Sequence, residues 1–499
     1  MGAKTEQVLW SKGIQTWRDS LALEKAHGQP TSQMERIRQF IHESEIQYKA
    51  RNILFFAENL PKSEGWRLYP DFQDELAFVD VETTGLSIVY DEITVIGLYD
   101  LRQPRLFIRG QNLQEFPSAL EPYKILVTFN GSLFDLPFIR SEFPGIKLPP
   151  VHLDLRFLLQ RLGLRGGLKR IEERLGIARS EELQGVNGYG ATVLWNRYLR
   201  GDRAALRLLL EYNLADILNL KILLDFVYRQ FSKRCLPALE VRVPSSHSQA
   251  QRLPVVSHPP APTEEMISQG RRTFDLLLRS LSREDGYPVV VGIDLTGSAS
   301  RASGWACLRG NDAEVGRFHS DEDLIAETLS RNPELVSIDS PLSIPKGRHC
   351  TSDQCWCRRK YGIARECERE LWRRGVRVYP CLLPSMQNLT KRGMRLAREF
   401  RSRGLKVIES YPGAAQDILR ISRKKTSLEE LKVGIRDLGL RGESLEASVN
   451  HDELDAVTSA LVGYFFLAKS YEALGTPEEE FLIIPKKLNG NSHGSRQPQ

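Results

Sequence analysis

The chain has 499 residues, and its 69 Lys and Arg side chains exceed its 63 Asp and Glu side chains to give a formal net charge of +6. This length exceeds one ordinary hydrophobic core, so we expect two or three domains. No apolar run approaches the ~20 residues that cross a bilayer, and the first residues lack the apolar core of a secretory signal. We therefore expect a soluble, cytoplasmic protein without membrane contact. The mild basic excess permits a polyanionic partner but does not require one.

Apolar periodicity predicts the elements of a first unit in chain order. A helical lead covers residues 1–70, and a domain follows over residues 71–235. Within that domain, short apolar runs predict strands, and later stretches with helical spacing predict helices. The strands are expected at 76–82, 92–100, 105–111 and 124–131, and the helices at 167–177 and 202–231.

A Pro- and Ser-rich stretch over residues 236–265 has no sustained apolar period and reads as a linker. The pattern then repeats in a second unit over residues 266–485, before a tail at 486–499 that we expect to be disordered. Strands are expected at 287–297, 304–310, 314–319, 335–342 and 405–412, with a last helix at 451–474. The shared order of strands and helices predicts an α/β protein with two ribonuclease H-like domains, each a mixed five-stranded sheet flanked by helices.

The stretch "LAFVDVETTGLS", residues 76–87, ends a buried strand in two carboxylates, Asp80 and Glu82. Residues two apart on a strand share one face, so these like charges need a neutralising partner. Asp135 follows another predicted strand, and Tyr212 and Asp216 lie four apart on one helix face. Carboxylate oxygens suit Mg²⁺ or Mn²⁺, and two such ions can hydrolyse a phosphodiester. In that reading the Tyr212 hydroxyl orients the attacking water.

The motifs "DVETTGL", "FNGSLFDLPF" and "YNLAD" resemble the three exonuclease motifs of the DEDD superfamily. The Tyr-x-x-x-Asp spacing is similar to its tyrosine subgroup, and more narrowly to predicted bacterial ribonuclease H-like exonucleases. The resemblance covers residues 50–232 and implies 3′ to 5′ exonuclease activity with Asp80, Glu82, Asp135 and Asp216 as metal ligands. As structural alternatives, Asp135 could only cap a helix, and Tyr212 could be a core residue with a hydrated hydroxyl.

A second set of acidic residues marks the second unit. Its members are Asp294, Asp339, Glu409, Asp452 and Asp455. The motifs "GID", "IDSPL", "ESYPGA" and "HDELDA" resemble an uncharacterised family of predicted ribonuclease H-like nucleases over residues 288–470. This set could hold a second metal site, or the unit could bind substrate without catalysis. Glu409 could instead pair with a nearby arginine.

Between Asp339 and Glu409, four of the seven cysteines fall within 18 residues of one another. Cys350, Cys355, Cys357 and Cys367 offer enough thiols for a zinc ion or an iron–sulfur cluster, although reduced thiols without metal are an alternative. Arginines interleaved with Trp356 and Tyr361 in this region are typical of a polyanion-facing segment, or of an ordinary charged helix face.

These observations favour a metal-dependent nuclease whose partner is a nucleic acid. Two alternatives remain, namely a nucleic-acid-binding protein without catalysis and a hydrolase of small nucleotides. The choice between DNA and RNA, the strand structure of the substrate and the identity of any protein partner stay open.

Overall fold

The computed structural model describes residues 32–183, 188–235, 260–298, 301–423, 427–446 and 448–486, together with a few positions between 6 and 19. The chain divides into two compact units. The first comprises residues 1–82, 93–186 and 202–260, and the second comprises residues 83–92, 187–201 and 261–499. Most of the expected linker, residues 236–259, and nearly all of the expected tail, residues 487–499, lie outside the described residues.

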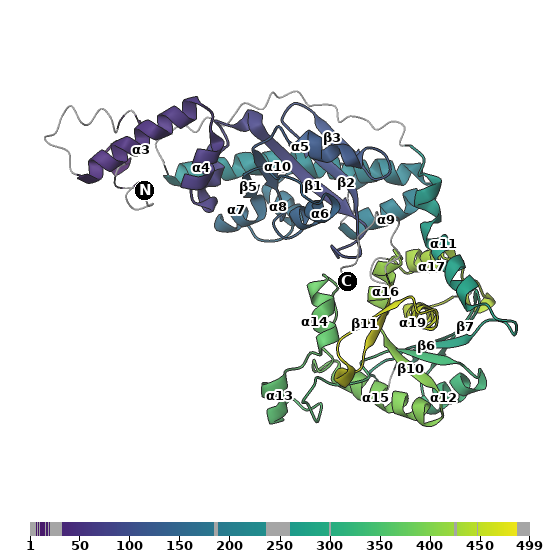
Figure 1. The fold of residues 1–499 in the computed structure, drawn as a ribbon. Coiled ribbons are helices and arrows are strands. Elements are labelled where there is room, and N and C mark those ends of the chain that lie inside the picture. The colour runs from purple at the N-terminus through teal and green to yellow at the C-terminus, as the bar shows by residue number, and fades with distance from the viewer. Residues whose placement is uncertain are drawn as a thin grey trace, which may run out of the picture. The chain divides into compact units, whose positions relative to one another are not determined.

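The first unit is built on a five-stranded mixed sheet in the order β3-β2-β1-β4-β5 (Figure 1). The central β1 pairs in parallel with β4, β4 pairs in parallel with β5, and the hairpin β2-β3 is antiparallel. The strands are β1 (Leu76–Thr83), β2 (Ile93–Tyr99), β3 (Pro104–Ile108), β4 (Ile125–Thr128) and β5 (Val151–Asp154).

Helices cover both faces of this sheet. The helices of the first unit are α3 (Ser32–Lys49), α4 (Ile53–Asn59), α5 (Phe116–Leu120), α6 (Asp135–Glu142), α7 (Leu155–Arg161), α8 (Leu168–Leu175) and α10 (Arg203–Cys235), with 3-10 turns at Lys62–Leu68, Gln73–Glu75, Leu113–Glu115 and Glu181–Leu183. The long helix α10 is continuous, as its uninterrupted apolar period predicts.

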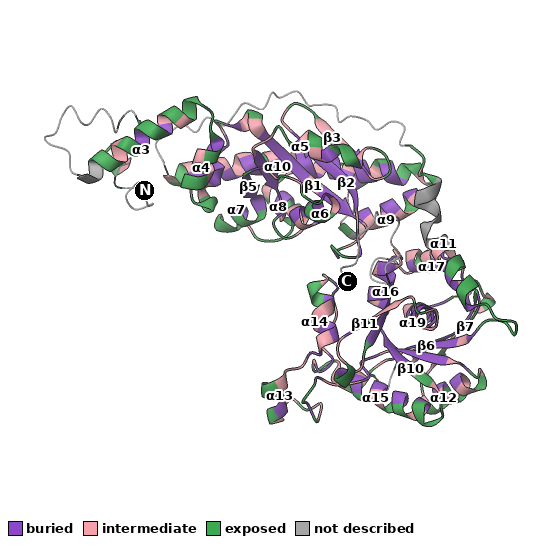
Figure 2. Ribbon diagram, viewed as in Figure 1, coloured by how far each residue is buried: buried purple, intermediate pink, exposed green. Residues whose placement is uncertain are grey.

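Side-chain alternation along β1 decides which helix meets which face. Leu76 and Phe78 pack in the cluster that contains α7 and α10, whereas Ala77, Val79 and Val81 pack in the cluster that contains α5 and α6. Continuing the alternation places the next two even-numbered residues, Asp80 and Glu82, on the α10 face. The buried strands and the exposed outer helix faces are distinguished by colour in Figure 2.

The edge strand β5 is not among the strands expected from the sequence. Its four residues, "VHLD", lie directly before α7, so the short strand has no turn signal that separates it from the helix. Asp154 ends the strand and caps α7 through a hydrogen bond from the Arg156 amide.

The second unit contains a seven-stranded sheet in the order β11-β12-β10-β9-β6-β7-β8 (Figure 1). Its strands are β6 (Val289–Asp294), β7 (Ser303–Arg309), β8 (Asp312–Phe318), β9 (Leu335–Asp339), β10 (Lys406–Ser410), β11 (Tyr471–Leu474) and β12 (Leu482–Pro485). Its helices are α9 (Gly188–Leu199), α11 (Glu264–Leu281), α12 (Asp321–Ser330), α13 (Trp356–Tyr361), α14 (Glu366–Arg373), α15 (Gln387–Ser402), α16 (Pro412–Ile418), α17 (Leu428–Asp437), α18 (Glu443–Glu446) and α19 (His451–Leu467), with a 3-10 turn at Pro477–Glu479.

Helix α19 packs on one face of this sheet and α12 and α15 pack on the other. The glycine of β6, Gly292, permits the close approach of α19, because a Cβ atom there would lie 2.0 Å from the Ala456 carbonyl oxygen. Helix α19 is buried along almost its whole length, which explains its nearly uniform apolar composition.

The second sheet corrects the expected five strands to seven, because β11 and β12 extend it beyond β10. The last helix also ends earlier than expected, at Leu467 instead of residue 474. Lys469 has a positive φ of 55° and turns the chain, so that Tyr471–Leu474 pairs with β12 in antiparallel register. No helix among the described residues is long and apolar enough to cross a membrane.

Candidate active site

The candidate site of the first unit is built from the end of β1 and the middle of α10. Asp80 and Glu82 project from the α10 face of β1, as their spacing predicts, and Tyr212 and Asp216 lie one helical turn apart on α10. Gly97 on the neighbouring strand β2 permits this approach, because a Cβ atom there would lie 2.1 Å from Asn213 Oδ1. Asn213 Nδ2 in turn donates a 2.9 Å hydrogen bond to Asp80 Oδ2, which ties the helix to the strand.

Three carboxylates converge at this point. Asp80, Glu82 and Asp216 each place an oxygen within 4.8 Å of the oxygens of the other two. Glu82 and Asp216 are buried, and Asp80 is partly buried. Burial, followed by the charge of Asp216, raises the pKa of both Asp80 and Glu82 well above the usual range. Without a cation, the cluster therefore binds protons more strongly than ordinary carboxylates do.

Asp135 lies beside this group rather than within it. It begins α6, and its Oδ1 accepts a 3.0 Å hydrogen bond from the backbone amide of Val81, the residue between the two acids of β1. Burial raises the pKa of Asp135 to about 7, although the backbone hydrogen bonds oppose that shift. The turn before α6 is held by Asp154, whose carboxylate accepts from the amides of Asn130 and Ser132 at 2.8 and 3.0 Å.

A partly buried arginine, Arg179, contacts the carboxylate cluster. It forms ion pairs with Asp216 and with Glu172 of α8, the latter through two hydrogen bonds of 2.6 and 2.8 Å. Burial raises the pKa of Asp216 to about 6, and the guanidinium of Arg179 limits that rise. Arg179, Glu172 and Asn213 are not among the site residues expected from the sequence. Asn213 lies directly after Tyr212 in "YNLAD", whereas nothing near Arg179 in the sequence marks its contact with α10.

Tyr212 is buried and lies between two cations and the acids. The Lys169 ammonium nitrogen is 4.5 Å from the centre of its ring, and the Arg179 guanidinium is 5.5 Å from it. Burial, followed by the charges of Asp216, Glu82 and Asp80, raises the pKa of the phenol. Burial also lowers the pKa of Lys169. The phenol therefore keeps its proton near neutral pH and is available as a hydrogen-bond donor rather than as a base.

The donor set fits a divalent cation of the Mg²⁺ or Mn²⁺ type. Such ions prefer carboxylate oxygens, and the three carboxylates supply hard ligands at one place. A cation there would relieve the mutual repulsion that raises their pKa values. Asp80, Glu82 and Asp216 are the residues that could hold it, and Asp135 could join them.

The acids of the second set are divided between two faces of the second sheet. Asp294 and Asp339 end β6 and β9 as directly paired residues, and alternation places both on the α19 face. Helix α19 carries Asp452 and Asp455 three residues apart; Asp455 Oδ1 accepts a 2.7 Å hydrogen bond from Gln416, and Asp452 lies 3.6 Å from Arg301.

Glu409 lies on the opposite face. It pairs with Ile338, whose side chain packs with α12 and α15. There it accepts two hydrogen bonds from Arg365, of 2.7 and 2.5 Å, and a third from the Leu342 amide at 2.7 Å. Both side chains are almost completely buried. Glu409 is therefore one half of a buried ion pair, as the arginine alternative predicts.

The four candidate cysteine ligands do not all meet. Cys350, Cys355 and Cys357 lie together with His349, whereas Cys367 is buried on α14 against Leu371 and Leu474.

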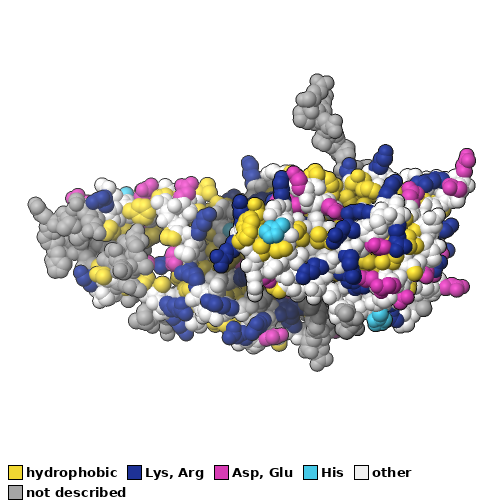
Figure 3. Space-filling model, turned by 90° about the horizontal axis from the view of Figure 1, so that it is seen from below, with side chains coloured by type: hydrophobic (Ala, Val, Ile, Leu, Met, Phe, Trp, Pro, Cys, Tyr) yellow, Lys and Arg dark blue, Asp and Glu magenta, His cyan; other side chains and the backbone are white. Residues whose placement is uncertain are grey.

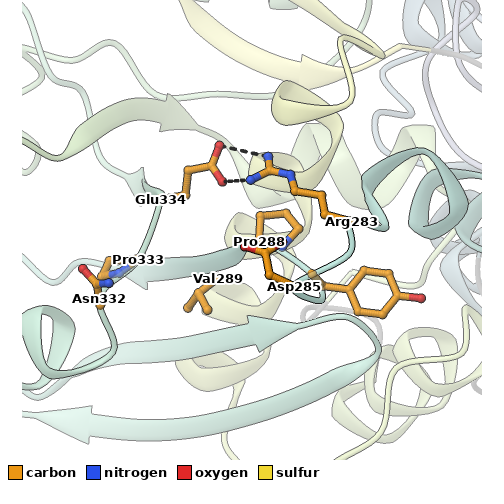
Figure 4. A pocket seen from close by; sticks show the side chains of 8 residues that line it. Arg283, Asp285, Pro288, Val289, Asn332, Pro333 and Glu334 are labelled. Carbon is orange, nitrogen blue, oxygen red and sulfur yellow. Dashed lines mark hydrogen bonds and ion pairs between the residues drawn. The ribbon is translucent and has the colours of Figure 1, made fainter.

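A pocket of the second unit, drawn in Figure 4, lies at the beginnings of β6 and β9, where Arg283 and Glu334 form an ion pair. Asp294 and Asp339 are the last residues of those two strands, so the pocket and the two acids lie at opposite ends of the strands.

Comparison with known proteins identifies the fold of the first unit. Residues 77–228 match the family model described as the ribonuclease H superfamily. The chain therefore contains a ribonuclease H-like domain, within an α/β protein that has two mixed sheets. No curated protein matches the chain.

Several solved structures also match. NrnC of Brucella melitensis with bound Mg²⁺ is 24% identical, with a TM-score of 0.24, over 33% of this chain and 77% of that one. A protein described as the apo form of a nuclease is 21% identical, with a TM-score of 0.25, over 36% and 80%. The family B DNA polymerase of Pyrobaculum calidifontis is 14% identical, with a TM-score of 0.27, over 83% and 53%.

Proposed function

We propose that the chain is a metal-dependent nuclease that hydrolyses phosphodiester bonds of DNA or RNA from the 3′ end. One observation carries the proposal: Asp80, Glu82 and Asp216 converge within 4.8 Å at the end of the central strand of a ribonuclease H-like domain. Two of these carboxyl groups are buried and the third is partly buried, and they repel one another when charged. A bound divalent cation would remove that repulsion, which a purely structural role for the three acids does not explain.

The division of roles follows from the contacts of each side chain. Asp80, Glu82 and Asp216, together with Asp135, would hold two Mg²⁺ or Mn²⁺ ions. Such ions would lower the pKa of a bound water and stabilise the charge on the leaving oxygen of the phosphodiester. The protonated hydroxyl of Tyr212 donates a hydrogen bond that orients the attacking water. Lys169 and Arg179, the cations beside Tyr212, favour the approach of a phosphate group.

The second unit contributes substrate binding in this proposal. Of the five acidic residues of the second set, Glu409 is paired with Arg365 and is not available to a metal ion. The remaining four lie on the α19 face of the sheet. Lys and Arg side chains are spread among acidic ones over the face of the molecule drawn in Figure 3. Such a mixed surface is compatible with salt-dependent binding along a strand.

The experiment is a cleavage assay on strands labelled at either end. With Mg²⁺ or Mn²⁺, a 5′-labelled single strand should give a ladder of progressively shorter labelled products, whereas a 3′-labelled strand should release labelled mononucleotide at once. The reverse pattern would contradict the proposed direction. Binding without cleavage would favour the non-catalytic alternative, and cleavage of free nucleotides or dinucleotides alone would favour a small-nucleotide hydrolase.

A further inference from the structure

A second cluster of metal-ligating side chains lies in the segment between β9 and α14. His349, Cys350, Cys355 and Cys357 place their ligand atoms within 4.8 Å of one another. The Sγ atoms of Cys350 and Cys357 are 3.7 Å apart, and Cys355 Sγ is 3.3 Å from His349 Nε2. The ligand that joins the three cysteines is thus a histidine, rather than Cys367.

These separations are those of ligands around one tetrahedral ion. With Zn–S bonds of about 2.3 Å and Zn–N bonds of about 2.0 Å, tetrahedral angles separate two sulfurs by about 3.8 Å and a sulfur from a nitrogen by about 3.5 Å. The observed distances of 3.7 and 3.3 Å agree with both values. An iron–sulfur cluster binds its thiolates through different iron atoms, which spreads the ligands farther apart.

We propose that His349, Cys350, Cys355 and Cys357 bind one Zn²⁺ ion as a structural site. Three thiolates and one imidazole complete a tetrahedral shell, so no position stays open for substrate. The site is independent of the carboxylate cluster of the first unit, and it does not depend on the proposed nuclease activity.

The segment around these residues has no hydrophobic core of its own. Between residues 346 and 362, only Arg348 and Cys357 are buried, and neither contributes a hydrocarbon core. Trp356 is 61% exposed. A short segment without a hydrophobic core usually needs a disulfide or a metal ion, and the structure shows every cysteine as a free thiol.

Arg348 shapes the backbone that presents the ligands. Its guanidinium donates to the carbonyl oxygens of Cys350 at 3.0 Å, Ser352 at 3.0 Å and Gly362 at 3.1 Å. These bonds close the loop from both ends, so they help to hold the four ligands close together. Such supporting contacts are typical of metal sites whose ligands must be oriented.

Metal analysis of the full-length protein, purified with a reductant and without chelators, tests the proposal. We expect about one equivalent of zinc and no iron, and replacement by cobalt should give the visible absorption of a tetrahedral thiolate complex. Protein without zinc, iron at a similar level, or a disulfide between Cys350 and Cys357 would each overturn the proposal.

Variants test which side chains are ligands. Cys357→Ser should reduce bound zinc at least tenfold, and His349→Ala should weaken zinc retention against a competing chelator by a similar factor. His349 is exposed, so its removal does not perturb a core. Cys367→Ser and His319→Ala are the matched controls and should keep wild-type zinc. Loss of zinc in Cys367→Ser with full retention in His349→Ala would overturn the ligand assignment.

Limited proteolysis tests the structural role without relying on variants that could unfold. Arg358, Arg359 and Lys360 are exposed trypsin sites within the segment. Removing zinc should increase cleavage at these three bonds by tenfold or more, and adding zinc back should reverse the effect. Equal cleavage rates with and without zinc would overturn the role that we assign to the ion.

Discussion

The backbone amide of Val81 donates a 3.0 Å hydrogen bond to Asp135 Oδ1. This contact fixes the start of α6 against the strand that carries Asp80 and Glu82, and it gives Asp135 a structural role beside any catalytic one. Substitution of Asp135 by asparagine or by alanine distinguishes the two roles. Asparagine keeps an oxygen that accepts the hydrogen bond, whereas alanine does not.

We therefore expect Asp135→Asn to fold at least as stably as the wild type and to lose most of its cleavage activity. Asp135→Ala should lose activity and also about 1–3 kcal/mol of unfolding free energy relative to Asp135→Asn, because the buried Val81 amide is left without a partner. Chemical denaturation of both variants measures the difference. Equal stabilities would show that the contact contributes nothing to the fold.

The raised pKa values predict how stability depends on pH in the metal-free protein. In the folded state the pKa of Asp135 is about 7 and the pKa of Asp216 is about 6. In the unfolded chain both pKa values are about 4. Protonation of these two carboxyl groups therefore stabilises the folded state. This stabilisation is complete below about pH 4 and is lost as the pH rises through the pKa values of the folded state. For Asp216 this loss is on the order of 2–3 kcal/mol.

In a chelator, the melting temperature of Asp216→Asn should therefore rise relative to the wild type as pH increases from 5 to 8. Adding Mn²⁺ at pH 8 should stabilise the wild type more than Asp216→Asn. The control Glu211→Gln removes a carboxylate from the same helix, outside the cluster, and should follow the wild type. If the difference in melting temperature between the wild type and Asp216→Asn stays constant with pH, the pKa of Asp216 is not raised in the folded protein.

Tyr212→Phe tests the phenol separately from the acids. Because the hydroxyl stays protonated and contributes only a hydrogen bond, its loss should slow turnover by about 10²-fold. The ring that contacts Lys169 is retained, so the fold and Mn²⁺ affinity should stay unchanged. Calorimetric titration with Mn²⁺ and single-turnover cleavage measure the two effects. An unaltered rate would assign Tyr212 to the core alone.

The first candidate site could be inferred from sequence because its signals are local. The alternation in "LAFVDVE" places Asp80 and Glu82 on one face, and the helix period brings Tyr212 and Asp216 together. The ion pair between Arg179 and Asp216 joins residues far apart in the chain, so no local period reports it. For Glu409, the sequence could not tell which sheet face the side chain takes, because β10 is short and both faces are buried.

The buried ion pair of Arg365 and Glu409 predicts a large effect on stability. Arg365 also pairs with Glu368, and all three side chains are nearly inaccessible to solvent. Arg365→Met leaves two buried carboxylates without a cation and should cost about 3–5 kcal/mol. The control Arg369→Met removes an exposed pair with Glu366 and should cost at most about 1 kcal/mol. Equal losses in denaturation would contradict the structural role of the pair.

The proposed nuclease activity depends on metal binding by the carboxylates of the first unit. Mn²⁺ binding and strand cleavage are measured together in full-length wild type, Asp80→Asn, Asp216→Asn, Asp339→Asn and the control Glu211→Gln. We expect both cluster variants to lose tight Mn²⁺ binding and to fall to background cleavage while staying folded, and we expect Asp339→Asn and Glu211→Gln to keep both properties. Wild-type cleavage by Asp80→Asn, with loss of cleavage in Asp339→Asn, would contradict the claim and assign catalysis to the second unit.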